Sequence, residues 1–208
     1  MKNTKEKILE CALDCFNENG FYNTTLRQIA SSLGISQGNL NYHFRTKGEI
    51  LEILYFDLVE RMEIEIKKMG NPQSMMQVLF ESSKISLSCL YAYRFLMRDL
   101  YKIMKEHTNI QGHYNQLPTT RLTQFTQIFD NLINQGVLRV EEFENEYRRL
   151  FVRMNILGDN WINTQELINK EIKNPIEYYQ LLLFEVIYPY LTSQGKLDFN
   201  KIIEKDSK

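Results

Sequence analysis

Residues 25–51 read TLRQIASSLGISQGNLNYHFRTKGEIL, and the spacing within this stretch decides the fold. Thr25 and Gln28 form a capping-box pattern, in which a hydroxyl and an amide side chain satisfy backbone groups at a helix start. The apolar residues that follow recur at helical spacing and form one stripe: Leu26, Ile29, Ala30 and Leu33. The stretch therefore begins as a short amphipathic helix.

A glycine turn and a second short helix follow. Gly34 supplies the positive φ that ends a helix sharply, and Ser36 is placed to cap the next helix. Leu40 and Phe44 give this second helix a buried face and leave its polar side chains outside. The next helix begins near Lys47. Two short helices joined by a tight glycine turn are the arrangement that holds a helix in the DNA major groove.

Upstream, residues 4–19 have the apolar spacing of another helix, which ends near Gly20. Three such helices make a head of about 45 residues, a size that is marginal on its own. We therefore expect a boundary near residue 47 and a head that leans on the body through the long following helix.

The sequence beyond the head predicts helices almost throughout. The Asn174-Pro175 pair indicates a helix start, and Pro189 is expected to kink or end the last long helix. The tail from Lys196 onward is expected to form a short amphipathic turn followed by frayed polar residues. The predicted fold is all-α, with about nine helices. Those beyond the head lie at about 47–69, 73–89, 91–107, 119–135, 143–168 and 175–193.

Composition excludes several classes of protein. The chain has 25 Lys plus Arg against 26 Asp plus Glu, so charge alone does not indicate nucleic acid. Residues 1–10 lack the apolar region of a signal peptide, and no apolar run is long enough to span a membrane. Cys11, Cys15 and Cys89 make neither a disulfide framework nor a metal site, so a reduced, cytoplasmic protein without cofactor or metal is expected.

The head resembles the DNA-binding head of the TetR family of bacterial transcriptional regulators. The resemblance covers roughly the first quarter of the chain, with the family's spacing throughout. It rests on Phe16, Gly20, Thr25, Arg27, Ile29, Ala30, Gly34, Ile35, Ser36, Gly38, Leu40, His43, Phe44, Lys47 and Leu51.

One position departs from the family's pattern. The family usually has a tyrosine directly after the leucine of the recognition helix, where its hydroxyl reaches a phosphate. This chain has Asn41 there, followed by Tyr42. Either Tyr42 takes over the contact with the DNA backbone, or Asn41 reads a base, since asparagine pairs in two-pronged fashion with adenine.

The resemblance implies a role for each matching position. Thr25 and the amides at its helix start would hold one phosphate, and Lys47 would hold another. Arg27 would reach a guanine or a phosphate, and Gly38 would allow close approach to the duplex. His43 would grip the backbone or, alternatively, cap or pack locally. The predicted DNA-contacting residues are Thr25, Arg27, Gln37, Gly38, Asn39, Asn41, Tyr42, His43 and Lys47, with Gln37, Asn39 and Asn41 as base readers.

The rest of the chain is unusually aromatic. In the TetR family the corresponding part is a cage of helices around a cavity for a small apolar or amphipathic molecule. The resemblance therefore implies a DNA-binding domain at residues 1–47. It implies an antiparallel helical domain for ligand binding and dimerisation at residues 48–208. Aromatic and methionine side chains line adaptable pockets, although aromatic stripes at helical spacing are usually core. The candidate effector contacts are Phe95, Tyr101, Met104, Phe125 and Trp161.

A homodimer is expected, because one recognition helix reads too few bases to be selective and two-fold symmetry doubles the contacts. By resemblance, the helices at about 143–168 and 175–193 would pair with their copies. The predicted function is a repressor that a small apolar or amphipathic effector releases from a palindromic operator on double-stranded DNA. The alternatives are a regulator of the same fold controlled by a protein partner or by no ligand, and a helical enzyme. The sequence has no recognisable catalytic motif that would support the last.

Overall fold

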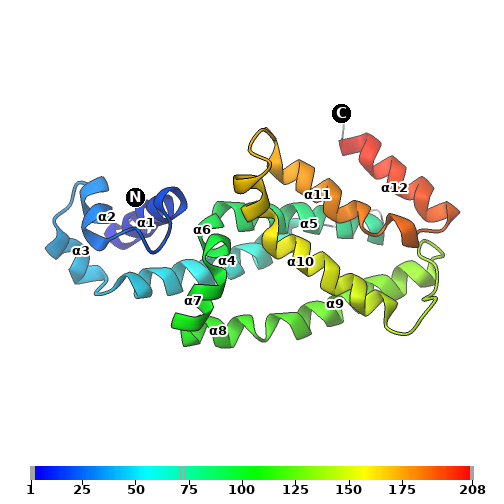
Figure 1. The fold of residues 1–208 in the computed structure, drawn as a ribbon, viewed down its shortest axis with the longest axis horizontal. Helices are drawn as coiled ribbons and strands as arrows, with labels where there is room; N and C mark the ends of the chain where they lie inside the picture. Colours follow the sequence, from blue (N-terminus) through cyan, green and yellow to red (C-terminus); the bar gives the residue numbers. More distant parts are fainter. Residues whose placement is uncertain (1–2, 71, 73, 207–208) are drawn as a thin grey trace. The chain divides into compact units, whose positions relative to one another are not determined.

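The computed structural model describes residues 3–70, 72 and 74–206. These residues form α-helices and one short 3-10 helix, and their only β-type pairing is a single bridge between Leu138 and Leu191 (Figure 1). The predicted all-α fold is confirmed. The helices are α1 (Thr4–Asn19), α2 (Leu26–Ser32), α3 (Gln37–His43), α4 (Lys47–Lys68), α5 (Met75–Ala92), α6 (Arg94–Arg98), α7 (Leu100–Glu106), α8 (Thr108–Tyr114), α9 (Leu117–Asn134), α10 (Glu146–Leu167), α11 (Pro175–Glu185), η1 (Tyr188–Tyr190) and α12 (Ser193–Asp206).

The chain divides into two compact units. The head unit contains residues up to 63 together with 89–115, and so includes α1 to α3, most of α4, and α6 to α8. The body unit contains residues 64–88 and those from 116 onward, and so includes most of α5 and α9 to α12. The predicted domain boundary after residue 47 stays a prediction.

The first helices of the head unit begin and end as their sequence predicts. Thr25 and Gln28 form the expected capping box, and Ser36 accepts a hydrogen bond from the Asn39 amide to cap α3. Gly34 has the positive φ, 70°, that its turn requires. The side chains that face inward are buried: Ile8, Ala12, Phe16, Ile29, Ala30, Leu40 and Phe44.

The predicted helix at 91–107 is wrong in detail, because the chain is interrupted twice there, between α5 and α6 and again between α6 and α7. Asn17 of α1 explains the interruption between α5 and α6. Its side-chain nitrogen donates to the carbonyl of Ala92 at 2.8 Å, and its oxygen accepts from the amide of Phe95 at 3.2 Å. These bonds satisfy backbone groups that a continuous helix would pair internally. This division, together with α8 and α12, which the sequence did not predict, raises the count from about nine to the twelve α-helices described.

Aromatic side chains fill the core of the body unit. Phe125 and Phe129 of α9 stack at a centroid distance of 3.9 Å, and Phe129 meets the ring of Tyr147 from α10 at 5.1 Å. Phe80 of α5 packs edge-on against Phe184 of α11 at 4.9 Å. The core therefore joins helices from both ends of the sequence of this unit.

The C-terminal segment forms a helix, which the sequence prediction missed. α12 is 14 residues long, and its Phe199 ring stacks on Phe184 at 4.6 Å. Burial of that ring stabilises a segment that looks frayed when its sequence is considered alone. Pro189 does end the last long helix as expected, since α11 stops at Glu185 and Pro189 lies in the short 3-10 helix.

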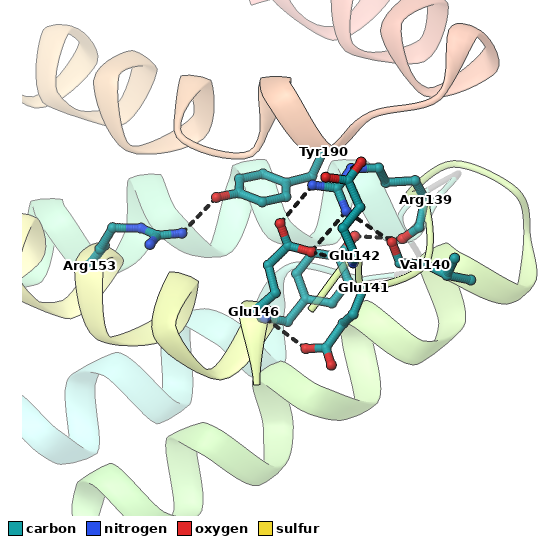
Figure 2. A network of polar contacts seen from close by, with 8 residues as sticks. Arg139, Val140, Glu141, Glu142, Glu146, Arg153 and Tyr190 are labelled. Atoms are coloured by element: carbon teal, nitrogen blue, oxygen red, sulfur yellow. Dashed lines mark hydrogen bonds and ion pairs between the residues drawn. The ribbon is translucent and has the colours of Figure 1, made fainter. Parts of the chain in front are cut away.

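A partly buried ion pair holds the loop between α9 and α10 (Figure 2). Two nitrogens of Arg139 donate to the two carboxylate oxygens of Glu146 at 2.8 and 2.7 Å. The guanidinium also lies over the Tyr190 ring, and the Tyr190 hydroxyl accepts a hydrogen bond from Arg153 at 2.6 Å. Hydrogen bonding from Arg139 lowers the pKa of Glu146 to about 2, despite its burial. This clasp ties the start of α10 to the segment after α11.

Candidate nucleic-acid interface

The structure exposes most of the predicted DNA-contacting residues on the head unit. His43 and Lys47 are half-buried. The exposed ones all belong to α2, α3 or the position just before α2: Thr25, Arg27, Gln37, Gly38, Asn39, Asn41 and Tyr42.

Two fully buried anchors fix the orientation of α3. Leu40 and Phe44 have exposed fractions of 0% and 2%. Gly38 lies on the opposite, exposed side, and a Cβ placed there would meet only the Ser36 hydroxyl, at 3.9 Å. The fold itself therefore does not require glycine at position 38. The outer face of α3 is left as a shallow polar surface.

Tyr42 is largely exposed, with an exposed fraction of 86%. Its ring meets that of His43 edge-on, with a centroid distance of 5.2 Å. Asn41 beside it is also exposed. Both side chains therefore project from the head, and the phenol of Tyr42 leans against the imidazole.

The hydroxyl of Thr25 is already engaged by its own helix. It accepts from the Gln28 amide at 3.2 Å and donates to the Gln28 side-chain oxygen at 2.9 Å. The same oxygen accepts from the Thr25 amide at 2.7 Å. Thr25 therefore fixes the start of α2 by a closed set of local hydrogen bonds.

The ammonium of Lys47 lies inside the head unit. Its Nζ donates to the carbonyl oxygens of Phe21 at 2.5 Å, Thr24 at 2.7 Å and Tyr22 at 3.4 Å. It also lies 4.4 Å from the centroid of the Phe21 ring. Withdrawal from water lowers the pKa of Lys47, and the positive charge of Lys102 lowers it further. The predicted phosphate contact thus has its charged group turned toward the chain.

The five candidate effector residues are divided between the two units. Phe95 is fully buried against Phe16 in the head unit, whereas Tyr101 there is 75% exposed and Met104 is half-buried. In the body unit, Trp161 is buried beside Tyr179, with a centroid distance of 5.1 Å. The fifth, Phe125, lines a pocket.

That pocket has a volume of about 500 Å³. It lies within the body unit, between α9 and the loop and first turn leading into α10. Spacing along a helix did not predict most of its walls, because they come from the loop after α9 and from the first turn of α10 as well as from α9 itself. An aromatic floor and a charged rim define it, formed by Phe125, Phe129 and Tyr147 and by Asp130, Glu141 and Arg148.

The described residues contain no cluster of three or more His, Cys, Asp or Glu side chains placed to hold a metal ion. Among these same residues, no helix is both long and apolar enough to cross a membrane. The thiols of Cys11 and Cys15 are free, and burial raises the pKa of Cys11 to about 11.

These features define a class of protein. A capped short helix that follows a glycine turn, is anchored by Leu40 and Phe44, and displays polar side chains outward is the recognition helix of a helix-turn-helix DNA-binding head. The body unit has its own aromatic core and pocket.

Comparison with known proteins identifies the family within this class. Residues 8–54 match the family described as bacterial regulatory proteins, tetR family, and residues 58–199 match the family described as bacterial transcriptional repressor. The chain is 29% identical over 154 residues to the "Probable HTH-type transcriptional regulator YttP" of Bacillus subtilis (strain 168), covering 71% of this chain and 69% of that protein.

Solved structures agree. A TetR-family transcriptional regulator from Marinobacter aquaeolei VT8 superposes with a TM-score of 0.78 and 27% identity over 98% of both chains. A regulator from Saccharomonospora viridis, in complex with choline, gives 0.70 with 18% identity over 90% of this chain and 96% of that one, a likeness of fold alone.

The protein belongs to the TetR family of bacterial transcriptional regulators, which are DNA-binding regulators of the repressor type. The resemblance stated from the head alone is therefore confirmed, and the second match extends it over the body. These relatives are regulators of transcription and not enzymes, as the sequence predicted.

Proposed function

We propose that the protein is a homodimeric repressor that binds a palindromic operator in the cytoplasm and is released by a small apolar or amphipathic effector. The observation that carries the DNA-binding part is the outer face of α3, where polar side chains project from a helix anchored by Leu40 and Phe44. A helix held in this way enters the major groove as a rigid body.

We assign base reading to Gln37, Asn39 and Asn41, which are exposed along α3. Asparagine and glutamine amides pair two-pronged with adenine in the major groove. Gly38 lets the duplex approach this face, since the fold has no internal need for glycine there. The exposed guanidinium of Arg27 reaches a guanine or a phosphate.

We assign the contact with the DNA backbone to Tyr42, in place of the tyrosine that the family usually has one position earlier. Its 86% exposure supports this role, and the ring of His43 steadies its phenol. His43 adds a second backbone contact. The Thr25 hydroxyl stays in the capping box at the start of α2. The first backbone amides of α2 then face a phosphate of the duplex.

The proposed dimer forms through α10 and α11. α10 buries Leu150 and Trp161 within its own unit, yet it also exposes Val152, Ile156 and Leu167 to 51%, 59% and 76%. These three residues are spaced by four and eleven positions and so follow one stripe along the helix. A second apolar stripe on a helix marks an interface with a partner.

The proposed effector site is the pocket floored by Phe125, Phe129 and Tyr147. Its volume lies within the range for sites that take small molecules. An aromatic floor beneath a charged rim suits an amphipathic molecule. The choline complex of the S. viridis regulator shows that a protein of this fold takes such a ligand. Control by a protein partner, or by no ligand, is the alternative.

Operator binding is tested by fluorescence anisotropy with duplexes from the DNA flanking the gene. Wild-type protein is expected to bind one palindromic duplex selectively, with affinity that falls steeply as salt rises. Light scattering is expected to give twice the chain mass of 24.8 kDa. Ile156→Glu should yield a monomer without operator binding, whereas Thr123→Glu on the exposed side of α9 should not. A monomeric wild type, or one that ignores every flanking duplex, would contradict the proposal.

The effector site is tested by thermal shift with a panel of apolar and amphipathic molecules that includes choline. A ligand that raises the Tm should also lower operator affinity. Thr126→Trp, which places a large ring in the pocket wall, should abolish both effects. If no molecule shifts the Tm, control by a protein partner or by no ligand becomes the better account.

A further inference from the structure

The pocket between α9 and the start of α10 has an aromatic floor. Phe125, Phe129 and Tyr147 form it, with exposed fractions of 8%, 2% and 7%. The first two rings stack at a centroid distance of 3.9 Å, and the Phe129 ring meets that of Tyr147 at 5.1 Å. The face of an aromatic ring carries negative potential, so it attracts a cation and disfavours an anion. The floor therefore favours a ligand with a positive charge.

Two carboxylates line the same pocket, Asp130 from α9 and Glu141 from the loop that follows. The Oε1 atom of Glu141 accepts a hydrogen bond from the Tyr147 amide at 2.8 Å, which fixes this carboxylate at the start of α10 (Figure 2). Within the part of the chain that the structure describes, neither carboxylate forms an ion pair. Both negative charges are thus available to a cation from solvent.

Arg148 is the one cation among the described residues that line the pocket. It is exposed, and among these residues it forms no ion pair with Asp130 or Glu141. Two carboxylates and one guanidinium give the lining a net charge of −1. The net charge of the lining and the aromatic floor therefore favour the same sign of ligand.

We propose that this pocket takes an organic cation, a quaternary or protonated tertiary ammonium that carries an apolar group. The aromatic floor and the carboxylates of Asp130 and Glu141 would hold the ammonium. The apolar walls, formed by Leu122, Ile133 and Val140, would take the apolar group. The inference rests on the proposed effector site and names its ligand class. It excludes anionic amphiphiles such as fatty acids, because the floor and the net charge of the lining both repel a carboxylate.

Three phenols of matching shape separate the effect of charge from that of size. The ring carries a trimethylammonium, a tert-butyl or a sulfonate group opposite the hydroxyl, which gives a cation, a neutral molecule and an anion of similar tetrahedral outline. Isothermal titration calorimetry with the full chain at neutral pH gives the three affinities. We expect the trimethylammonium compound to bind about tenfold more tightly than the tert-butyl compound, and the sulfonate not to bind. Equal or tighter binding of the tert-butyl or sulfonate compound would overturn the proposal.

Charge variants of the lining test which residues are responsible. Asp130→Asn combined with Glu141→Gln removes both negative charges and keeps an acceptor for the Tyr147 amide. Affinity for the trimethylammonium compound should fall about tenfold, whereas affinity for the tert-butyl compound should not change. Arg148→Gln should act in the opposite direction and strengthen binding of the cation. Glu144→Gln is the control, because Glu144 is an exposed carboxylate of the same loop that does not line the pocket. A double variant that binds the cation like the control would overturn the proposal.

Thr126→Trp locates the bound cation, since Thr126 lies in the pocket wall. It should abolish binding of the trimethylammonium compound, and unchanged binding would overturn the proposal by placing the cation elsewhere. Preference for the tert-butyl or sulfonate compound would overturn the ligand class but leave the pocket as an effector site. If none of the three compounds binds, the cation class is overturned, and the thermal-shift panel then decides the effector site by itself. Operator binding by the ligand-free protein is measured separately from all these outcomes.

Discussion

The head unit and the body unit each use a cation to hold a loop, but the two cations have opposite kinds of partner. Lys47 is bound by neutral carbonyls and an aromatic face, whereas Arg139 forms a two-pronged pair with the buried carboxylate of Glu146. The pKa of Lys47 is lowered by loss of water, and that of Arg139 is raised by its hydrogen bonds to Glu146. We call the Arg139–Glu146 pair the body clasp. Because it includes a carboxylate, it is a stronger and more acid-sensitive interaction than the contacts of Lys47.

The difference matches what each loop has to do. The loop at 20–25 positions a surface that must adjust to DNA, so a hold without a counter-charge is sufficient. The loop at 139–146 fixes the start of α10, the helix assigned to the dimer interface. We therefore expect changes in the body clasp to act mainly on stability, and changes around Lys47 to act mainly on operator affinity.

The largest effect is expected at Gly195, which packs against the body loop. A Cβ there would lie 2.1 Å from the carbonyl oxygen of Val137, which already accepts from the Thr192 amide at 3.0 Å. Gly195→Ala should therefore destabilise the fold by about 3 kcal/mol. Thermal unfolding should show a Tm lowered by about 10 °C.

Gly112→Ala in α8 is the control, because no heavy atom lies within 4 Å of its added Cβ. It should leave the Tm unchanged or raise it slightly, because alanine loses less backbone entropy on folding than glycine does. Equal Tm values for the two variants would show that the segment after α11 is not packed as described.

A smaller loss of stability is expected when the body clasp itself is cut. Glu146→Gln removes the charge that pairs with Arg139, whereas Glu142→Gln removes one that is 68% exposed and 3.4 Å from the same guanidinium. Glu146→Gln should therefore lower the Tm clearly more than Glu142→Gln. If the two changes were equivalent, the clasp would contribute no more than a surface pair.

The pH dependence sharpens this contrast. Because hydrogen bonds from Arg139 lower the pKa of Glu146 from 4.5 to about 2, its contribution is complete above pH 4.5 and is lost as the pH falls through 2. The Tm difference between wild type and Glu146→Gln should therefore shrink between pH 4.5 and 2. A difference that stayed constant over this window would contradict the charged pair.

Substitution of a base-reading residue should have a different effect from a change around Lys47 or in the body clasp. Asn41→Ala is expected to cost about 2 kcal/mol of discrimination at one operator position and little elsewhere. Binding measured across a library of single-base operator variants should show this as relaxed selectivity at that position. A uniform loss at all positions would instead give Asn41 the role of a backbone contact.

The smallest effect is expected at Tyr22. Tyr22→Phe keeps the ring under Lys102 and removes only the hydrogen bond to Glu106, which is worth about 1 kcal/mol. Operator affinity should fall by severalfold, with the salt slope unchanged. Glu106→Gln should add little to Tyr22→Phe, since both changes remove the same hydrogen bond, and full additivity would show that the two side chains do not act together.

The head could be predicted residue by residue because its signals are local. The capping box at Thr25 and Gln28, the turn at Gly34, and the anchors Leu40 and Phe44 depend only on residues within a few positions. The direction of the Lys47 ammonium could not, since it depends on carbonyls more than twenty residues away.

The body shows the same limit more strongly. There α12 depends on the ring of Phe184; in the head unit, the break between α5 and α6 likewise depends on Asn17, which is remote in sequence. The pocket was found only through Phe125, because its other wall comes from the loop that leads into α10. Spacing predicts which face of a helix is buried, but not which distant segment covers it.

The most direct test of the account is the affinity of wild type and of a Gln37→Ala, Asn39→Ala, Asn41→Ala triple variant for the palindromic duplex and for a scrambled duplex, at one salt concentration. The account predicts that wild type prefers the palindrome by at least a hundredfold and that the triple variant binds both duplexes alike with near-wild-type affinity for the scrambled one. A triple variant that kept the wild-type preference would show that α3 does not read the operator.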